Sequence, residues 1–146
     1  MRIFVKDQGT FDEVKRIHDA SFSQWESAPT GVLREMFDKS DLFVIGSGES
    51  KKLLGFCIVS RKFGEPYVWA IAVDAQSRGL GIGKSLLDEV ACFAREYPAS
   101  GITLTVNVDN VTAQRLYLKE GYRVFKFLPN YYGLGGSGII MRRKLL

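Results

Sequence analysis

Three glycines alternate with other residues, just ahead of a lysine and a serine, in one short segment of the chain. The segment reads Arg78, Gly79, Leu80, Gly81, Ile82, Gly83, Lys84 and Ser85. An apolar run over residues 67–73 precedes it, and apolar residues at helical spacing follow from Leu86. A strand, a glycine loop and a helix in this order present unpaired backbone N–H groups and the positive end of a helix dipole to an anion. Since glycine has no Cβ, a ligand can approach the backbone closely, so the segment predicts a phosphate- or pyrophosphate-binding loop.

Three known phosphate loops can be compared with this segment. The dinucleotide pattern G-x-G-x-x-G fails because Lys84 stands where the third glycine is required. The nucleotide P-loop pattern fails because Arg78 occupies the position of its first glycine. The third pattern, R/Q-x-x-G-x-G/A, is the pyrophosphate loop of the GNAT acetyltransferase superfamily, and the segment resembles it at every position. A glycine-rich turn that only connects a strand to a helix is the structural alternative.

Composition limits the class of protein. The chain has 146 residues, 46% hydrophobic and 25% charged, which is typical of one globular domain over residues 1–146. No apolar stretch approaches the ~20 residues of a membrane helix, and the N-terminus becomes charged at Lys6 and Asp7. We therefore expect a cytoplasmic protein without a signal peptide or a membrane partner. A net charge of +4 is low for a nucleic-acid binder, whereas a polyanionic coenzyme accounts for it equally well.

The residues that most often bind metals are few and scattered. Cys57 and Cys92 lie in apolar segments at a spacing that fits no metal or redox motif, and both are expected to be small core residues. His18 is the one histidine, and we expect it at the surface or the boundary of a helix. This set argues against a zinc site, so no metal is expected.

The first half of the chain predicts two helices followed by three strands. A strand over residues 2–5 precedes a helix that starts at a capping box, Thr10 to Glu13, and buries Phe11, Val14, Ile17 and Phe22. A second helix over residues 30–39 is expected to bury Val32, Leu33, Met36 and Phe37. Strands over residues 41–46, 53–61 and 67–73 are joined by short links, which are turns over residues 47–50 and 64–66. They therefore form an antiparallel meander.

The second half predicts a crossover. A helix from about Gly81 to Tyr97, ended by Pro98 and Gly101, leads to a strand over residues 102–106. Strands joined by a crossover helix run parallel, so this strand should be parallel to the one ending at Val73. Another helix is capped by Asn110 and stopped by Gly121, and strands over residues 122–128 and 139–143 follow. The fold class is one mixed α/β sheet with helices on both faces.

Three segments resemble the GNAT superfamily in the expected order. They are Ile71 to Asp74 leading into Arg78 to Lys84, the run from Asn110 through Ala113, Leu116 and Tyr117 to Gly121 and Tyr122, and the strand Ile139 to Met141. Asn130, Tyr131 and Tyr132, followed by that strand, resemble more weakly the C-terminal hairpin of the protein N-terminal (ribosomal-protein) alanine acetyltransferases. The resemblance implies a mostly antiparallel sheet whose parallel pair splays around acetyl-CoA.

The resemblance also implies a role for individual residues. Backbone groups of Ile71, Ala72 and Val73 would pair with the pantetheine arm and the acetyl carbonyl. Asn110 would contact the coenzyme, and Tyr117 would be the general acid at the sulfur. The pyrophosphate would be held by Arg78, Gly79, Leu80, Gly81, Ile82, Gly83 and Lys84. Taken singly, Asn110 also fits a simple helix cap, and Tyr117 and Val73 fit core positions.

The general base is not identified by the resemblance. The subfamily carries a glutamate on the strand before the Asn110 helix, where this chain has Thr105. The position used by some other members lies at Trp69-Ala70, and the acidic pair before the last strand is replaced by residues 135–138, Gly-Gly-Ser-Gly. A water relayed by Asn107, by Thr105 or by a backbone carbonyl is one candidate, and Glu26 is another.

The acceptor site is expected between the loop of residues 23–29, the strand at residues 67–69 and the hairpin at residues 130–132. These segments contribute an aromatic, mostly uncharged set: Trp25, Tyr67, Trp69, Tyr131 and Tyr132. Such a groove suits a peptide N-terminus or a hydrophobic amine better than a polycationic polyamine, which would need carboxylates. The sequence thus predicts an acetyl-CoA-dependent N-acetyltransferase, as a monomer or homodimer with no nucleic-acid partner. A small-molecule amine acetyltransferase, a non-catalytic CoA-binding regulatory module and, more distantly, a nucleotide-binding P-loop protein are the alternatives.

Overall fold

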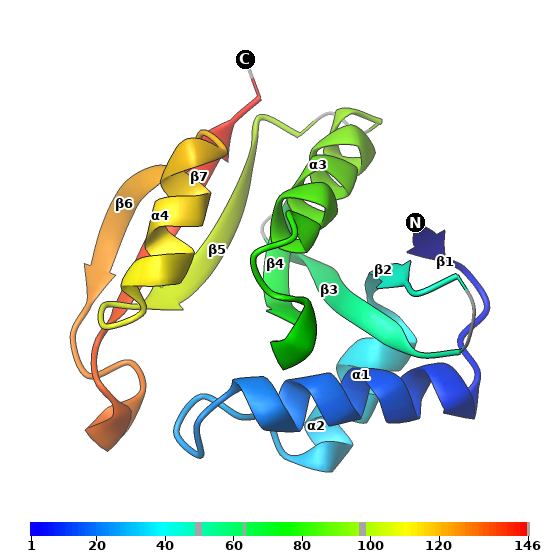
Figure 1. The fold of residues 1–146 in the computed structure, drawn as a ribbon. Helices are drawn as coiled ribbons and strands as arrows, with labels where there is room; N and C mark the ends of the chain where they lie inside the picture. Colours follow the sequence, from blue (N-terminus) through cyan, green and yellow to red (C-terminus); the bar gives the residue numbers. More distant parts are fainter. Residues whose placement is uncertain (49–50, 63, 97–98, 146) are drawn as a thin grey trace.

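A computed structural model describes residues 1–48, 51–62, 64–96 and 99–145. Seven strands form one sheet in the order β1-β2-β3-β4-β5-β7-β6 (Figure 1). The strands are β1 (Arg2–Ile3), β2 (Asp41–Gly46), β3 (Leu53–Lys62), β4 (Glu65–Val73), β5 (Gly101–Asn107), β6 (Arg123–Leu128) and β7 (Gly138–Lys144). The helices are α1 (Gln8–Ser21), α2 (Thr30–Lys39), α3 (Ile82–Arg95) and α4 (Val111–Lys119), with short 3-10 turns η1 (Ala75–Ser77) and η2 (Gly133–Gly135).

The sheet is antiparallel except at β4 and β5, so both the predicted meander and the predicted parallel pair are confirmed. This parallel pair is short, because only Tyr67 with Thr103 and Val68 with Leu104 are in register. The β3–β4 register shifts between Ile58 and Val59, which leaves Trp69 as an extra residue on β4. A bulge of this kind bends its strand and ends regular pairing. Beyond it, β4 and β5 diverge toward their carboxyl ends (Figure 1).

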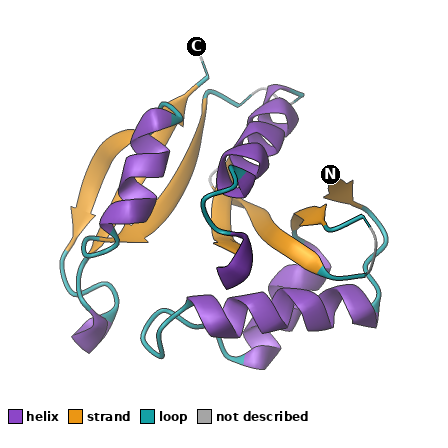
Figure 2. Ribbon diagram, in the orientation of Figure 1, coloured by secondary structure: helices purple, strands orange, loops and turns teal. Residues whose placement is uncertain are grey.

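Helices cover both faces of the sheet, as predicted (Figure 2). Alternate residues of β2 and β3 point to opposite sides, which produces two apolar cores. One core joins Phe43 and Cys57 to α3 and α4, and the other joins Leu42 and Phe56 to α1 and α2. The sheet therefore lies between two layers of helices. The strands β4 and β5 separate from each other within this sheet.

Most element bounds agree with the sequence to within a residue or two, but the start of α1 was predicted wrongly. The helix begins at Gln8, and its N-cap is Asp7, whose carboxylate accepts hydrogen bonds from the N–H and the hydroxyl of Thr10 at 2.8 and 2.9 Å. Thr10 is thus inside the first turn and is no capping-box residue. The strand expected over residues 2–5 ends at Ile3.

Three predictions of burial were also wrong. Val32 is 43% exposed, since Leu33 and Phe37 form the buried stripe of α2. Cys92 is exposed, whereas Cys57 is buried as expected. His18 is buried, at 2% exposure, and is no boundary residue.

Part of the predicted turn at residues 47–50 and the expected end of the α3 helix at Tyr97 and Pro98 lie outside the described residues. Among the helices that the structure describes, none is long and apolar enough to cross a membrane. Within the same ranges, no group of three or more His, Cys, Asp or Glu side chains is arranged to hold a metal ion.

Candidate active site

Two cavities meet where β4 and β5 diverge. One has a volume of about 600 Å3 and is lined by the glycine loop, and the other has a volume of about 260 Å3 and is lined by aromatic side chains. The residues that line both are Phe22, Glu26, Ile71, Asn110, Ala113 and Tyr117. A ligand in the larger cavity therefore comes within reach of a second ligand in the smaller one.

The larger cavity is bounded by the predicted phosphate loop. Of the residues predicted to bind the coenzyme, all except Leu80 line it; the side chain of Leu80 is 73% exposed. Gly79 and Gly81 both have φ of +79°, a left-handed conformation that L side chains seldom adopt, and a Cβ at either position would meet nothing within 4 Å. Gly81 is also the N-cap of α3. The loop thus leaves open space in front of the first amides of α3, as an anion site requires.

Cationic side chains flank this loop. Lys84 donates to Asp88 at 2.7 Å and lies 4.0 Å from Glu120. The Lys84–Asp88 hydrogen bond is the first cause of the raised pKa of Lys84. Arg78 lines the cavity beside it. Arg78 and Lys84 are the basic side chains among the described residues that line this cavity, and Lys84 is ion-paired in the absence of a ligand.

A buried carboxylate fixes the strand end that leads into the loop. Asp74 accepts from Arg16 at 2.9 Å, lies 3.7 Å from Lys52, and its N–H donates to the Leu54 carbonyl at 2.7 Å. The hydrogen bond from Arg16 holds the pKa of Asp74 below its ordinary value. Arg16 lies on α1, where it also pairs with Glu13. Its ion pair with Asp74 therefore connects α1 to the end of β4.

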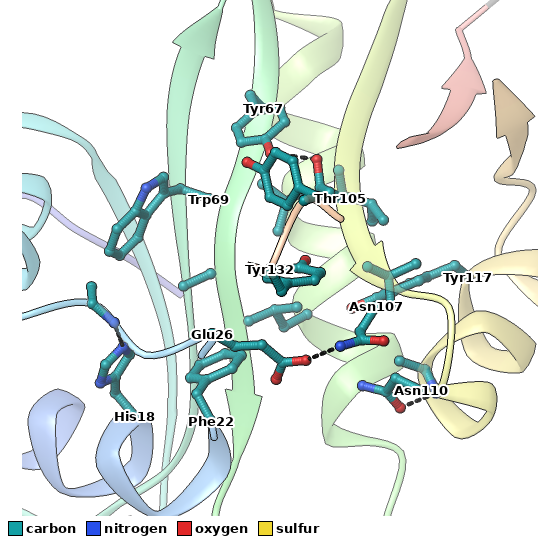
Figure 3. A pocket seen from close by; sticks show the side chains of 18 residues that line it. His18, Phe22, Glu26, Tyr67, Trp69, Thr105, Asn107, Asn110, Tyr117 and Tyr132 are labelled. Carbon is teal, nitrogen blue, oxygen red and sulfur yellow. Dashed lines mark hydrogen bonds between the residues drawn. The ribbon is translucent and has the colours of Figure 1, made fainter. Parts of the chain in front are cut away.

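Tyr117 and Asn110 lie where the two cavities meet (Figure 3). Tyr117 is 7% exposed, and burial raises the pKa of its phenol well above the ordinary value. The hydroxyl therefore keeps its proton near neutral pH and is able to donate it. Asn110 caps α4 by accepting the Ala113 N–H at 3.1 Å. The cap reading of Asn110 is thus confirmed, while its side chain also lines both cavities.

The smaller cavity contains most of the predicted aromatic set. Tyr67, Trp69, Tyr131 and Tyr132 line it, and the hydroxyls of Tyr67 and Thr105 are 2.6 Å apart. Burial is the first cause of the raised pKa of both Tyr67 and Tyr132. Thr105 therefore faces the cavity, in a hydrogen bond with a phenol.

Trp25 is the one residue of the predicted aromatic set that lies outside this cavity. Its side chain lies against Gly135, where a Cβ could not be placed without a clash, so it joins the loop of residues 23–29 to the η2 hairpin. Trp25 is 46% exposed and does not line either cavity, unlike the other aromatic residues of the predicted set.

Glu26 is the one acidic residue among the described residues that line either cavity. Its carboxylate accepts a hydrogen bond from Asn107 Nδ2 at 2.7 Å, and the same nitrogen donates to the Gly135 carbonyl at 2.9 Å. Figure 3 shows the Glu26 carboxylate reaching from the loop toward Asn107 at the end of β5. The two side chains named separately as candidates for the missing base are therefore in direct contact.

His18 is a site residue that the sequence did not reveal. It lines the smaller cavity, and Figure 3 shows it below the loop that carries Glu26. One feature of the sequence could have indicated its burial. His18 directly follows Ile17, which belongs to the buried stripe of α1, so the imidazole lies beside the core.

Comparison with known proteins places this geometry in a family. The sequence model of the acetyltransferase (GNAT) family matches residues 11–122. An uncharacterized N-acetyltransferase of Methanocaldococcus jannaschii is 36% identical over 94 residues, which cover 64% of this chain and 60% of that protein. The N-alpha-acetyltransferase RimI of Mycobacterium tuberculosis is 30% identical over 120 residues, which cover 80% of this chain and 73% of that protein. Two other relatives are matched over only 31% and 48% of their length.

A solved structure shares the fold along the whole chain. The crystal structure of Ard1 from Thermoplasma volcanium superimposes with a TM-score of 0.84 at 24% identity, covering 100% of this chain and 97% of that one. At this identity the likeness concerns the fold alone. It nevertheless includes the mostly antiparallel sheet and the diverging parallel pair on which both cavities depend.

Proposed function

The chain belongs to the acetyltransferase (GNAT) family, and we propose that it is an acetyl-CoA-dependent N-acetyltransferase that acts on the α-amino group of a peptide or protein. The observation that carries the proposal is the meeting of two cavities at Tyr117 and Glu26. One cavity has the features of a pyrophosphate site, and the other is aromatic with a single carboxylate. The M. tuberculosis relative is an N-alpha-acetyltransferase, which supports an α-amine as the acceptor.

The residues of the larger cavity fit acetyl-CoA. Amides of the Gly79–Lys84 loop and of the first turn of α3 would hold the pyrophosphate, with Arg78 and Lys84 adding positive charge. The side of β4 that faces β5 would pair, from Ile71 to Val73, with the amide groups of the pantetheine arm, because β5 is in register with β4 only at Tyr67 and Val68. When bound, the coenzyme supplies an acetyl group activated as a thioester.

Tyr117 and Glu26 would handle the protons of the transfer. As the amine nitrogen forms its bond to the acetyl carbon and the C–S bond breaks, the amine must lose a proton and the sulfur must gain one. Glu26, held by Asn107, would accept the amine proton directly or through one water. Tyr117, whose raised pKa keeps it protonated, would donate to the sulfur. A backbone N–H near Val73 would stabilise the charge on the carbonyl oxygen, typically by ~3–4 kcal/mol.

An α-amine is the acceptor best matched to this site. Its pKa of about 7.7–8.0 leaves roughly one molecule in seven neutral at pH 7, whereas a lysine side chain at about 10.4 is neutral only a few times in ten thousand. A cavity lined by one carboxylate and mostly aromatic and apolar side chains offers little help in deprotonating a lysine or in binding a polycation.

The test is a competition between two peptides at pH 7, with release of free CoA thiol and peptide mass as the readouts. One peptide has a free N-terminus and no lysine, and the other has the same sequence with a blocked N-terminus and one added lysine. We expect the free N-terminus to be acetylated faster. Faster acetylation of the blocked lysine peptide would refute the α-amine proposal. Tight CoA binding without turnover of peptides or small amines would instead favour a regulatory CoA-binding module.

A further inference from the structure

His18 is buried beneath the loop of residues 23–29 and uses both of its ring nitrogens. The backbone N–H of Ala28 donates to Nε2 at 3.3 Å, and Nδ1 lies 3.0 Å from the Asp19 carboxylate. The ring also packs against Phe22, with centroids 5.1 Å apart. A histidine placed in this way connects the last turn of α1 to the far end of the loop.

The hydrogen bonds define one protonation state. A backbone N–H can only donate, so Nε2 must present its lone pair to Ala28. The ring proton of the neutral imidazole is then on Nδ1, where the Asp19 carboxylate accepts it. Asp19 is itself paired with Lys15, whose hydrogen bond is the first cause of its lowered pKa.

The loop held by His18 carries Glu26. Within it, the N–H groups of Glu26 and Ser27 donate to the Ser23 carbonyl at 3.0 and 2.8 Å, so residues 23–27 form a compact turn. Across the cavity the loop is contacted at Glu26, by a hydrogen bond from Asn107, and at Trp25, which packs against Gly135. The position of the carboxylate in the cavity thus depends on the anchor at Ala28.

We propose that His18 is a positioning residue, whose neutral Nδ1–H form holds the Glu26 loop in place and whose protonation at Nε2 releases it. On protonation, Nε2 becomes a donor that faces the Ala28 N–H, and the anchor is lost. This role goes beyond the proposed acetyl transfer. It rests on the proposed function only in one respect, which is that release of the loop would displace Glu26 as the base.

Several titratable or charged groups surround this ring. Asp19 contacts it from α1 and is itself paired with Lys15. Glu26 lies on the loop, and Tyr67, Tyr131 and Tyr132 share the cavity of the ring, from β4 and from residues 130–132. A fall in pH is the expected trigger for release, because histidine is the side chain that gains a proton near neutral pH.

NMR tests the anchor without any reference to activity. The chain has one histidine, so two-bond 1H–15N spectra give a single set of imidazole signals. We expect a bare Nε2 and a protonated Nδ1 at high pH, and a faster hydrogen exchange of the Ala28 amide as the ring titrates. A proton on Nε2 in the neutral ring, or Ala28 exchange that does not follow the titration, would overturn the proposal.

Kinetics tests the consequence with a matched pair of variants. His18→Gln keeps an acceptor oxygen near the place of Nε2 but cannot be protonated, whereas His18→Leu removes the acceptor. At pH 8 we expect His18→Leu to lower kcat/KM for the peptide by about tenfold and His18→Gln to retain most of it, because one lost hydrogen bond leaves the loop in place in only a fraction of molecules. The affinity for CoA, measured by calorimetry, should not change in either.

The pH dependence separates positioning from simple packing. The ratio of kcat/KM for His18→Gln to kcat/KM for the unchanged protein should rise as the pH falls, because only the unchanged protein loses its anchor on protonation. Ionisation of the amine affects both proteins equally and cancels in the ratio. A constant ratio, or equal losses in the two variants, would refute a positioning role. If neither the unchanged protein nor either variant transfers acetyl groups, the proposed function is wrong. The NMR result still decides whether His18 anchors the loop.

Discussion

Gly81→Ala is the substitution that tests the glycine loop most directly. Gly81 caps α3 with φ of +79° and ψ of +13°, and a Cβ there would meet nothing within 4 Å. Steric exclusion is therefore absent in the protein without its coenzyme, and the cost of alanine is confined to the backbone. An L-residue in the left-handed helical region costs roughly 1–2 kcal/mol relative to glycine.

This cost must be divided between folding and binding. If the loop of the variant keeps its conformation, the free energy of unfolding falls by the full amount and CoA affinity is preserved, provided the new methyl group does not touch the ligand. If the loop relaxes, the protein is less destabilised, but binding must restore the left-handed conformation. In the second case the Kd rises by up to about 5–30-fold, which is the same 1–2 kcal/mol expressed as affinity.

The loss in the free energy of unfolding and the loss in the free energy of CoA binding should therefore add up to the same cost of about 1–2 kcal/mol in either case. Urea unfolding gives the first, and calorimetric titration with CoA gives the second. Gly31→Ala is the matched control, because Gly31 lies in α2 with open space at its Cβ and without a positive φ. It should raise stability by up to ~1 kcal/mol and leave the Kd unchanged. A Gly81→Ala protein with both quantities unaltered would refute the assignment of the loop.

Three further substitutions test the chemistry and the framework. Tyr117→Phe should lower kcat by roughly 10–1,000-fold with CoA affinity nearly intact, because the hydroxyl acts mainly in the transition state; full activity in the folded variant would make it a packing residue. Glu26→Gln should lower kcat/KM by about 100-fold or more if the carboxylate is the base, and unchanged kcat/KM would exclude it. Asp74→Asn should destabilise the protein at pH 7, since the lowered native pKa of Asp74 stabilises the fold above the unfolded pKa of about 3.9. That difference should shrink in urea unfolding as the pH falls below about 3.9 toward the native pKa, and a difference that stays constant as the pH falls below that value would show that Arg16 pairing is not its cause.

Local patterns were sufficient for the elements and for the coenzyme side of the site. The glycine loop and the first turn of α3 are contiguous, so spacing predicted a phosphate loop, and its glycines line the larger cavity. The other residues predicted to bind the coenzyme came from the family resemblance. The exposure of Cys92 also follows from spacing, since Cys92 is two residues from both Val90 and Ala94 on the buried stripe of α3. The exposure of Cys92 could therefore have been predicted, and the apolar composition of its segment was the wrong guide.

Contacts between distant segments could not be predicted. Glu26 and Asn107 are 81 residues apart, and nothing local to either residue indicates that they meet. The burial of His18 depends on the return of the loop to Ala28. The start of α1 was ambiguous in the sequence because Asp7 and Thr10 are both good capping residues. In the structure Asp7 is the N-cap, because its carboxylate accepts the Thr10 N–H.

The short pairing between β4 and β5 has a thermodynamic consequence. Two residue pairs, at Tyr67 and Val68 of β4, join the strands of the two halves of the sheet, and the rest of that seam is left for a ligand. A coenzyme that fills the seam binds the folded chain but not the unfolded one, and therefore stabilises it by RT ln(1 + [L]/Kd). Under the proposed function, the folded fraction, and with it resistance to proteolysis, should then follow the concentrations of acetyl-CoA and coenzyme A, which would couple the lifetime of the protein to its own cosubstrate.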